Sequence, residues 1–443
     1  MLKKLLFLSF TFLSLILFSQ HKSEKYNHHQ LEVYLKAQEA YELHEFYSAL
    51  NLFKSLDSLT GHNEHDYEIA VCYFHTRHWD EAELILKPFI VNKYNYPESI
   101  EFYWAVINHF NHDFETAKFF YSSYLTRLPH SKLHYDQIVS DIQHRISLCD
   151  IGKKMVIAEK NVIVRNLGAE LNTPFLDYGP IWLEDKGHIL FTSERPSTTG
   201  GEIDLTDGTY NEDIYYVTHP SERVWYEAKK IEGEIDSKSN ESILATSEDH
   251  SRVLIYKYDR NHFYSKSSGD LYEAKLESDS LFDLVKFPKN INSKYWESGA
   301  CYVGTSDLII VSDRPGGQGG SDLYLVKKTS KGWEKPVNLG TDINTSYDED
   351  SPYITPDGKY LFFASKGHDS MGGFDVFCSE KGKDGKWGTP INLGYPINTA
   401  HDEMYFSLNK ELTKMYLSSD RKGGHGDQDI YFIESTEGTR LVD

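Results

Sequence analysis

Five acidic residues recur at one constant place in the C-terminal two-thirds of the chain. Each lies five residues after the Asn or Asp of a short apolar-Asn/Asp-Ser/Thr motif; they are Asp177, Glu241, Glu297, Glu349 and Glu403. Converging carboxylates can attract a cation or a partner's basic group, or act as the acid and base of a lyase or glycosidase. These acids are therefore candidate binding residues at the mouth of a channel.

A structural role competes with binding for the same five acids. A base stands 17 or 18 residues after four of them, namely Arg195, Arg314, Lys366 and Arg421, and the second copy offers Lys257 or Arg260. An acid and a base at the ends of adjacent strands can form an ion pair within one repeat. We favour ion pairing and keep the channel-mouth role as the alternative.

A second acidic set stands where a glycine-rich loop enters an apolar-aromatic segment: Asp270, Asp322, Asp375 and Asp429. Calcium normally needs six to eight oxygen ligands, and neither loop 316–322 nor loop 423–429 has the spacing of an EF-hand. A simpler role is to accept hydrogen bonds from loop amides. We therefore expect these aspartates to hold their loops in place through such hydrogen bonds, an arrangement called a loop clasp below. We expect no metal and no cofactor.

Both acidic sets belong to a repeat of four short alternating segments, which predicts five copies of a four-stranded blade. The copies begin 64, 56, 52 and 54 residues apart, a period typical of β-propellers. The fifth copy ends before its fourth strand, whereas residues 162–168 match the fourth-strand segments 336–340 and 390–394. The sequence predicts a five-bladed propeller over residues 153–443, closed by an N-terminal strand, with six blades as the alternative.

One blade carries an insertion between Pro196 and Glu212 that the other copies lack. Because the blade does not require it, Glu202, Asp204 and Tyr210 in this loop are candidate partner contacts. A tolerated loop with no role is the interpretation that we favour.

The preceding segment is helical and repetitive. Three alanines lie 33 and 35 residues apart, and each has another alanine twelve residues before it, where paired helices cross closely; the pairs are Ala37/Ala49, Ala70/Ala82 and Ala105/Ala117. The segment 28–150 resembles three tetratricopeptide repeats with a capping helix from about Tyr135 to Cys149. We favour partner binding by this solenoid over a bracing role.

Histidines and cysteines suggest no further site. The pairs His62/His65, His75/His78 and His109/His112 fall at expected turns, which predicts solvated histidines rather than a metal site. The four cysteines match neither zinc nor redox spacing, which predicts small buried side chains.

The N-terminus and the charge balance indicate where the chain works. Residues 1–20 combine Lys3 and Lys4 with an apolar run too short to span a bilayer, which predicts a secretory signal and a periplasmic protein with no membrane span after cleavage. A retained N-terminal anchor is the alternative. The net charge of −21 argues against nucleic acid as a partner.

Segments 312–324 and 419–431 resemble the WD40-like repeats called PD40, which are related to the propeller of TolB. The order of signal, helical repeats and propeller resembles the N-terminal part of OmpA-family proteins of the Bacteroidota, including the PorE type of the type IX secretion and gliding machinery. Those relatives continue into a peptidoglycan-binding domain that this chain lacks. The resemblance implies attachment through another subunit at the inner face of the outer membrane, without direct peptidoglycan binding.

The expected fold class is α+β multidomain, with an α-helical solenoid followed by an all-β propeller. The expected function is that of a non-catalytic periplasmic scaffold for envelope proteins. The alternative is a glycan- or peptide-binding sensor that uses the propeller mouth. No nucleophile elbow, phosphate-binding loop or metalloprotease motif is present in the sequence, so we do not expect an enzyme.

Overall fold

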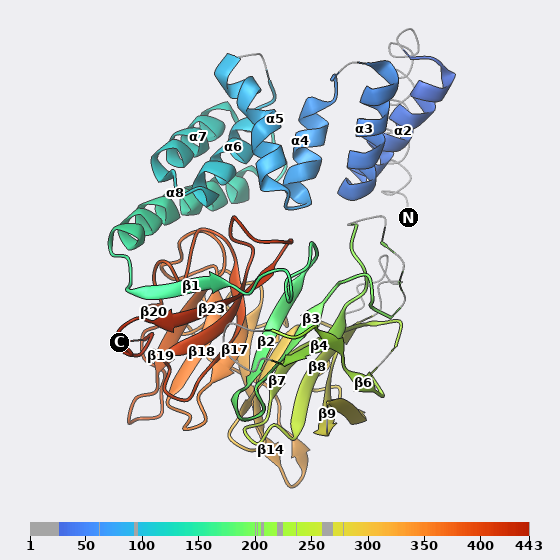
Figure 1. The fold of residues 1–443 in the computed structure, drawn as a ribbon. Helices are drawn as coiled ribbons and strands as arrows, with labels where there is room; N and C mark the ends of the chain where they lie inside the picture. Colours follow the sequence, from blue (N-terminus) through green and yellow to red (C-terminus); the bar gives the residue numbers. More distant parts are fainter. Residues whose placement is uncertain are drawn as a thin grey trace. The chain divides into compact units, whose positions relative to one another are not determined.

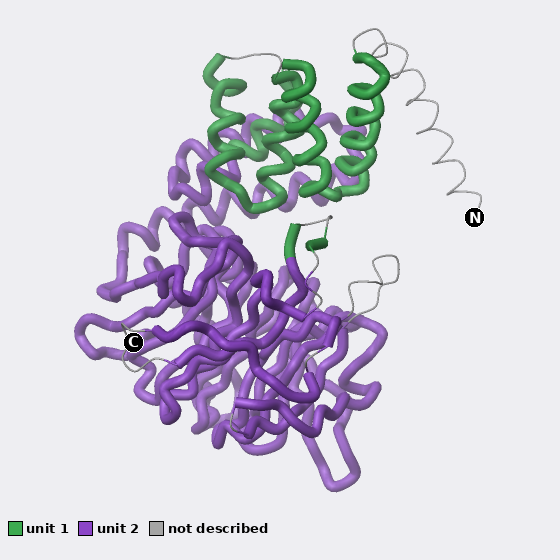
Figure 2. The backbone as a smooth tube through the Cα atoms, turned by 45° about the vertical axis from the view of Figure 1, so that its right-hand side comes forward, with its two compact units in different colours: residues 1–104, 203–209 green, residues 105–202, 210–443 purple. Residues whose placement is uncertain are grey.

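The chain is described here by a computed structural model covering residues 26–61, 63–92, 96–199, 201, 203–204, 208–218, 225–235, 237–258, 269–277 and 279–442. The predicted signal segment, Glu202 and Arg260 lie outside these residues. Two compact units divide the chain, residues 1–104 with 203–209 and residues 105–202 with 210–443 (Figure 2). Each unit is described by itself.

Seven helices make up the described N-terminal region (Figure 1). They are α2 His28–Glu42, α3 Phe46–Thr60, α4 Asp66–His75, α5 Trp79–Asn92, α6 Ser99–Phe110, α7 Phe114–Arg127 and α8 Tyr135–Ile157. Asn27 and Gln30 form a reciprocal capping box at the start of α2. Within the described residues, no helix is long and apolar enough to cross a membrane.

Small residues allow the helices to pack closely, as the sequence predicts. In the first unit α2 packs on α3 and α4 packs on α5. The alanines of the repeat have no exposed surface: Ala37, Ala49, Ala70, Ala82, Ala105 and Ala117. A larger side chain at these positions would push the paired helices apart.

Five blades of antiparallel strands form the propeller, which confirms the predicted fold. Blade 1 contains β2 Asp177–Leu183, β3 His188–Ser193, β4 Asp213–Thr218 and β5 Lys229–Lys230. Blade 2 contains β7 Asn240–Thr246, β8 Arg252–Tyr258, β9 Asp270–Glu277 and β10 Ser280–Lys286, with β6 Glu232–Gly233 pairing in parallel with β10.

The remaining blades follow the same order from the inner strand outward. Blade 3 contains β11 Gly299–Val303, β12 Asp307–Ser312, β13 Asp322–Val326 and β16 Val337–Asn338, plus the hairpin β14 Lys328–Thr329 and β15 Gly332–Trp333. Blade 4 contains β17 Glu349–Ile354, β18 Tyr360–Ser365, β19 Asp375–Glu380 and β20 Ile391–Asn392. Blade 5 contains β21 Glu403–Leu408, β22 Lys414–Ser419 and β23 Asp429–Ser435.

The N-terminal strand closes the ring as predicted. Strand β1 (Val162–Asn166) pairs antiparallel with β23 and supplies the fourth strand of blade 5 (Figure 1). The five inner strands contact one another in a closed order β2, β7, β11, β17, β21 and back to β2. Closure covers edges that would otherwise present unpaired backbone groups.

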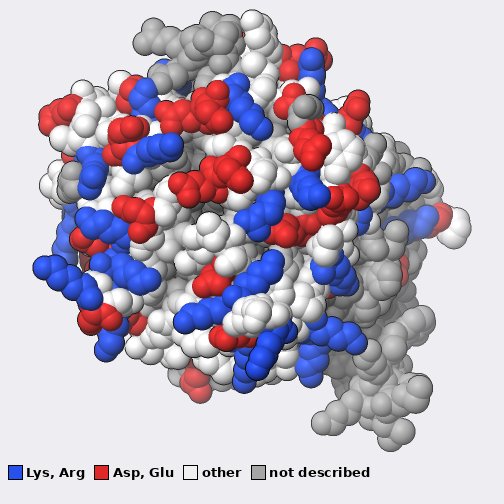
Figure 3. Space-filling model, turned by 90° about the horizontal axis from the view of Figure 1, so that it is seen from below, with Lys and Arg blue, Asp and Glu red and all other residues white. Residues whose placement is uncertain are grey.

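The hydrophobic core lies between neighbouring blades. One cluster joins Phe191 and Tyr215 of blade 1 to Tyr416 and Phe432 of blade 5. Aromatic side chains on facing sheets therefore hold the blades together. Viewed from below, acidic and basic side chains are interspersed over the surface, without a large area of one sign (Figure 3).

The second unit also includes the end of α6 together with α7 and α8, which contact the loops of blades 4 and 5. His109 Nε2 donates to the Met371 carbonyl at 2.7 Å, and the Phe110 and His401 rings stack 4.4 Å apart. His144 stacks on Tyr347 at 4.0 Å. These contacts fix the last helices to the propeller.

The expectation that the paired histidines are solvated is wrong for two of them. His109 is 2% exposed, and so is His65, which bonds through Nδ1 to Asp57 at 2.6 Å. Both rings fill packed space that the sequence alone could not show, and His62 lies outside the described residues. All four cysteines are buried and free, as expected.

Candidate binding site

The five repeated acids are held by the same contacts in blade after blade. Glu403 shows the pattern: it accepts from the Thr399 amide at 2.6 Å and hydroxyl at 2.8 Å, and from the Ser419 hydroxyl at 2.7 Å. The exposed fraction is 0% for Asp177, Glu297, Glu349 and Glu403 and 1% for Glu241. None of the five therefore faces open solvent.

Ion pairing is confirmed in four blades. Each arginine also donates to a backbone carbonyl at the start of its own repeat, as Arg421 does to Ile397 at 2.7 Å. The pairs are Arg195–Asp177 at 2.9 Å, Arg314–Glu297 at 3.0 Å, Arg421–Glu403 at 3.1 Å and Lys257–Glu241 at 2.9 Å. In these four blades the ion pair thus connects the ends of the first two strands.

The predicted pair Lys366–Glu349 is wrong. Lys366 Nζ lies 3.3 Å from Asp348 instead, and Gly367 occupies the place of the arginine two residues after the strand-end serine. His368 bonds through Nε2 to the Ile343 carbonyl at 2.9 Å, taking over the arginine's backbone contact but not its charge. Burial raises the pKa of Glu349 to about 7.

Burial affects three of the paired acids in the same direction. It raises the pKa of Glu241 to about 7, and hydrogen bonds from Ser237 and Lys257 only partly oppose it. It also raises the pKa of Asp177 and Glu403 against the lowering effect of Arg195 and Arg421. Removal from water therefore outweighs pairing at these positions.

The loop clasps are confirmed for three of the four aspartates. Asp322 accepts from the Gln318 amide at 2.7 Å, Asp375 from Met371 at 2.9 Å and Asp429 from His425 at 2.6 Å. Asp270 instead binds Lys286, and the loop before Asp270 lies outside the described residues. No cluster of three or more potential metal ligands occurs within the described part of the chain.

The Asn of the opening motif has a role that the sequence did not reveal, because it acts between blades. Asn398 accepts from the Val376 amide at 2.8 Å and donates to the Val376 carbonyl at 2.9 Å, in the third strand of the preceding blade. Asn172, Asn292 and Asn344 do the same to Ile430, Leu271 and Leu323. The repeated amide therefore links four of the blades, all but blade 2, to the one before.

The insertion in blade 1 is described only in part, and its partner-binding role stays a prediction. Tyr210 is half-buried, with its ring 5.2 Å from that of Phe175. Asp204 exchanges backbone hydrogen bonds with Gly208 and Thr209 at 2.8 Å. Residues 203–209 belong to the first unit, where Gly208 lies against the Tyr47 ring so closely that a Cβ would come within 2.3 Å of it.

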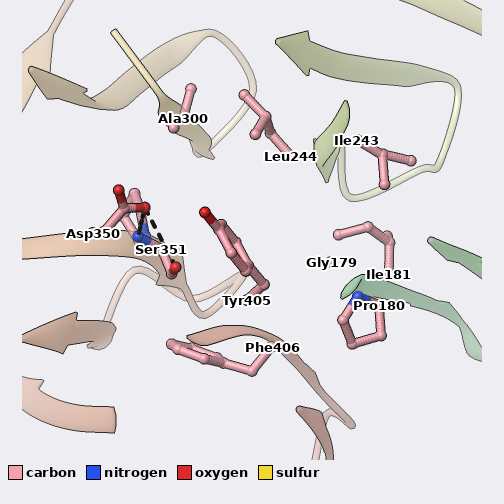
Figure 4. A pocket seen from close by; sticks show the side chains of 12 residues that line it. Gly179, Pro180, Ile181, Ile243, Leu244, Ala300, Asp350, Ser351, Tyr405 and Phe406 are labelled. Atoms are coloured by element: carbon pink, nitrogen blue, oxygen red, sulfur yellow. Dashed lines mark hydrogen bonds between the residues drawn. The ribbon is translucent and has the colours of Figure 1, made fainter. Parts of the chain in front are cut away.

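A cavity lies on the propeller axis, lined by all five inner strands (Figure 4). Four of these strands contain a β-bulge there, and the bulged backbone is left-handed at Gly179 (φ 68°), Ser351 (φ 52°) and Tyr405 (φ 45°). Such conformations are costly for serine and tyrosine. The bulges re-aim side chains toward the axis.

In blades 1 to 4 a polar residue directly follows the repeated acid, whereas in blade 5 Tyr405 stands two positions after Glu403. Because neighbouring residues in a strand point to opposite faces of the sheet, the residue after the acid points to the face opposite the acid. Tyr178 and Ser242 join hydroxyls at 2.9 Å, and Ser298 donates to Asp350 at 3.1 Å. The residue types vary between copies, so the repeat gave no signal for these residues. Strand alternation is the signal that could have indicated their direction.

Asp350 and Glu212 are the acids of this region. They are 8% and 7% exposed, and burial raises the pKa of Asp350. Burial and the charges of Asp350 and Glu212 raise the pKa of Tyr405 well above its ordinary value. The tyrosine therefore stays neutral beside two carboxyl groups.

Comparisons with known proteins leave the family open. No protein-family model matches the sequence, and no curated protein matches it as a relative. Solved structures with similarity include prolyl oligopeptidase B from Galerina marginata, at 13% identity and TM-score 0.31, covering 55% of this chain and 30% of that one. An exo-β-1,3-galactanase from Clostridium thermocellum has 11% identity, TM-score 0.38 and coverage of 61% and 62%.

The tricorn protease is a third similar structure, at 14% identity and TM-score 0.36. The match covers 62% of this chain and 23% of the tricorn chain, so the chain spans less than a third of both proteases. Similarity at this level assigns no activity.

Proposed function

We propose that this protein is a non-catalytic adaptor of the bacterial cell envelope, in which the helical repeats and the propeller hold protein partners. The observation that carries the proposal is the state of the repeated acids. Each of the five is buried and hydrogen-bonded within its own blade. Carboxylates committed in this way are poorly placed to act as the acid and base of a reaction.

The attachment of the last helices to blades 4 and 5 also supports an adaptor. Contacts such as Phe110–His401 and His144–Tyr347 join a helical surface to the propeller in one compact unit. A partner bound by these helices would be held in a fixed orientation to the propeller. Exposed apolar side chains on the helices of this unit, Phe119 at 66% and Ile157 at 78%, offer contact surface.

The resemblance to the N-terminal part of PorE-type proteins suggests the setting. Under this proposal the protein is exported to the periplasm and associates with outer-membrane or periplasmic subunits, with type IX secretion or gliding as the process. A glycan- or peptide-sensing role of the propeller mouth is the alternative, although the axial cavity, at about 20 Å³, has room only for a small end group of such a ligand.

Affinity purification after mild cross-linking of native membranes tests the adaptor. We expect the same envelope proteins to co-purify with the wild type in repeated preparations. The variant Phe119→Glu should capture less partner, whereas Ser122→Glu at an exposed position of the same helix should differ little, because an exposed aromatic residue contributes more to contact than an exposed serine. Equal capture by the two variants would rule out this helix as a partner surface, and absence of any co-purifying protein would contradict the adaptor itself.

A further inference from the structure

Two buried carboxyl groups near the propeller axis have only neutral hydrogen-bond partners. Asp350 accepts from Ser298 and from the Ser351 amide, and Glu212 accepts from Ser242 and Tyr258. Among the described residues, neither has a Lys, Arg or His within ion-pair distance. Among the five acids that follow the opening motif, all but Glu349 have a cation within 4 Å. The buried loop-clasp acids Asp322 and Asp375 also have neutral partners, but they do not line the cavity.

A buried carboxylate without a counter-charge is unfavourable unless it is protonated or a cation comes from outside. Aromatic rings beside these acids would favour a cation further, since the face of a tyrosine attracts positive charge. The rings of Tyr178 and Tyr405 lie 5.1 Å apart, and the charges of both Asp350 and Glu212 act on Tyr405. Figure 4 shows the hydroxyl end of Tyr405 directed toward Asp350 and Ser351.

The size of the axial cavity restricts the cation. Its volume is about 20 Å³, enough for one water-sized group. Gly179, Gly299 and Ala300 line it with almost no side chain, whereas Tyr405 and Phe406 narrow it. A primary ammonium is close to water in size and has three donors for carboxylate, hydroxyl and carbonyl oxygens, whereas a guanidinium or a quaternary ammonium is too large.

We propose that the axial cavity binds a primary ammonium group, held by Asp350 and bounded by Tyr405. The proposed function supplies its natural source, a lysine side chain or amino terminus presented by a partner. Binding of the ammonium group itself does not depend on that source. The proposed binding can therefore be tested with a free amine. The ammonium site can be disproved while the adaptor function is confirmed, and the reverse outcome is equally possible.

The test uses methylammonium chloride as the probe and the purified full chain. Saturation-transfer NMR should show transfer from the protein to the probe's methyl protons. A thermal scan should show a saturable rise in melting temperature of about 1 °C or more, because a ligand that binds only the folded state stabilises it. Tetramethylammonium chloride at equal ionic strength and methanol, which lacks the charge, should produce neither effect.

Asp350→Asn is the decisive variant, and it should fold because it removes an uncompensated charge without changing the side chain's shape. It should lose both the transfer signal and the thermal shift. Asp342→Asn, which makes the same chemical change at an exposed residue, should keep both. Equal responses of the wild type and Asp350→Asn would overturn the proposal. A response to tetramethylammonium, or calcium binding that excludes methylammonium, would overturn it as well.

Discussion

Glu297 and Glu349 occupy the same place in adjacent blades but differ in their counter-charge. Glu297 pairs with Arg314, whereas Glu349 has no arginine and has a pKa of about 7. We expect Glu297→Gln to lower the free energy of unfolding by about 3 kcal/mol, because it leaves Arg314 without its partner. Urea unfolding at pH 8 measures this directly.

Glu349→Gln should be much milder at pH 8. A carboxyl whose pKa is raised on folding binds protons more tightly in the folded state, so its contribution opposes folding increasingly as the pH rises from about 4.5 to 7. Glutamine removes that cost and keeps hydrogen-bonding capacity toward Thr345 and Ser365. If Glu349→Gln destabilises the protein at pH 8 as much as Glu297→Gln does, the distinction between the two blades is wrong.

The repeated residues were predictable from the sequence because every blade uses them in the same way. The acid-arginine pairs of blades 1, 3 and 5 and the aspartate clasps followed from spacing alone. Blade 4 could not be predicted, because Lys366 stands one position before the place of the arginine and the choice between Asp348 and Glu349 depends on three-dimensional geometry. Asp350 was missed because the residues at the equivalent position in the other copies are of different types.

At the scale of elements, ring closure depends on one face of β1. Val162 and Val164 pack against the core of blades 4 and 5, whereas Ile163, between them, is 46% exposed. Val164→Asp should lower the unfolding free energy by about 3 kcal/mol, because it buries a charge in an apolar cluster. The matched change Ile163→Asp should cost less than about 1 kcal/mol.

Chemical denaturation of the two β1 variants would check the closure. If both variants lose a similar amount of unfolding free energy, β1 contributes only its backbone pairing with β23. The sequence predicted this strand because its Asn-Leu-Gly ending matches the fourth strands of other blades. It did not predict β6 in blade 2, whose two residues pair in parallel with β10, because so short a segment has no pattern of its own.

At the scale of the whole molecule, a buried and a half-buried histidine make the second unit sensitive to acid. Burial lowers the pKa of His109 to about 3 and that of His112 to about 4. A histidine whose pKa is lowered on folding stabilises the fold above its unfolded pKa of about 6.5, and this stability is lost as the pH falls below that value. For His109 the loss at pH 5 is about 2 kcal/mol.

His109→Gln should remove this part of the pH dependence, since an amide can still donate to the Met371 carbonyl without titrating. Urea midpoints at pH 7 and pH 5 should differ less for His109→Gln than for the wild type, and His130→Gln at an exposed position should behave as the wild type. An unchanged pH dependence in His109→Gln would show that other groups govern acid unfolding. The sequence could not predict this burial, because blades 4 and 5 lie more than 200 residues along the chain from the helices they contact.

The adaptor is tested most directly by cross-linking mass spectrometry in the native cells. The account predicts reproducible intermolecular cross-links from lysines of the helical repeats and from lysines of the propeller, each to envelope proteins and to different ones. Cross-links confined to this chain itself, in cells where pairs of its own lysines are linked, would contradict it.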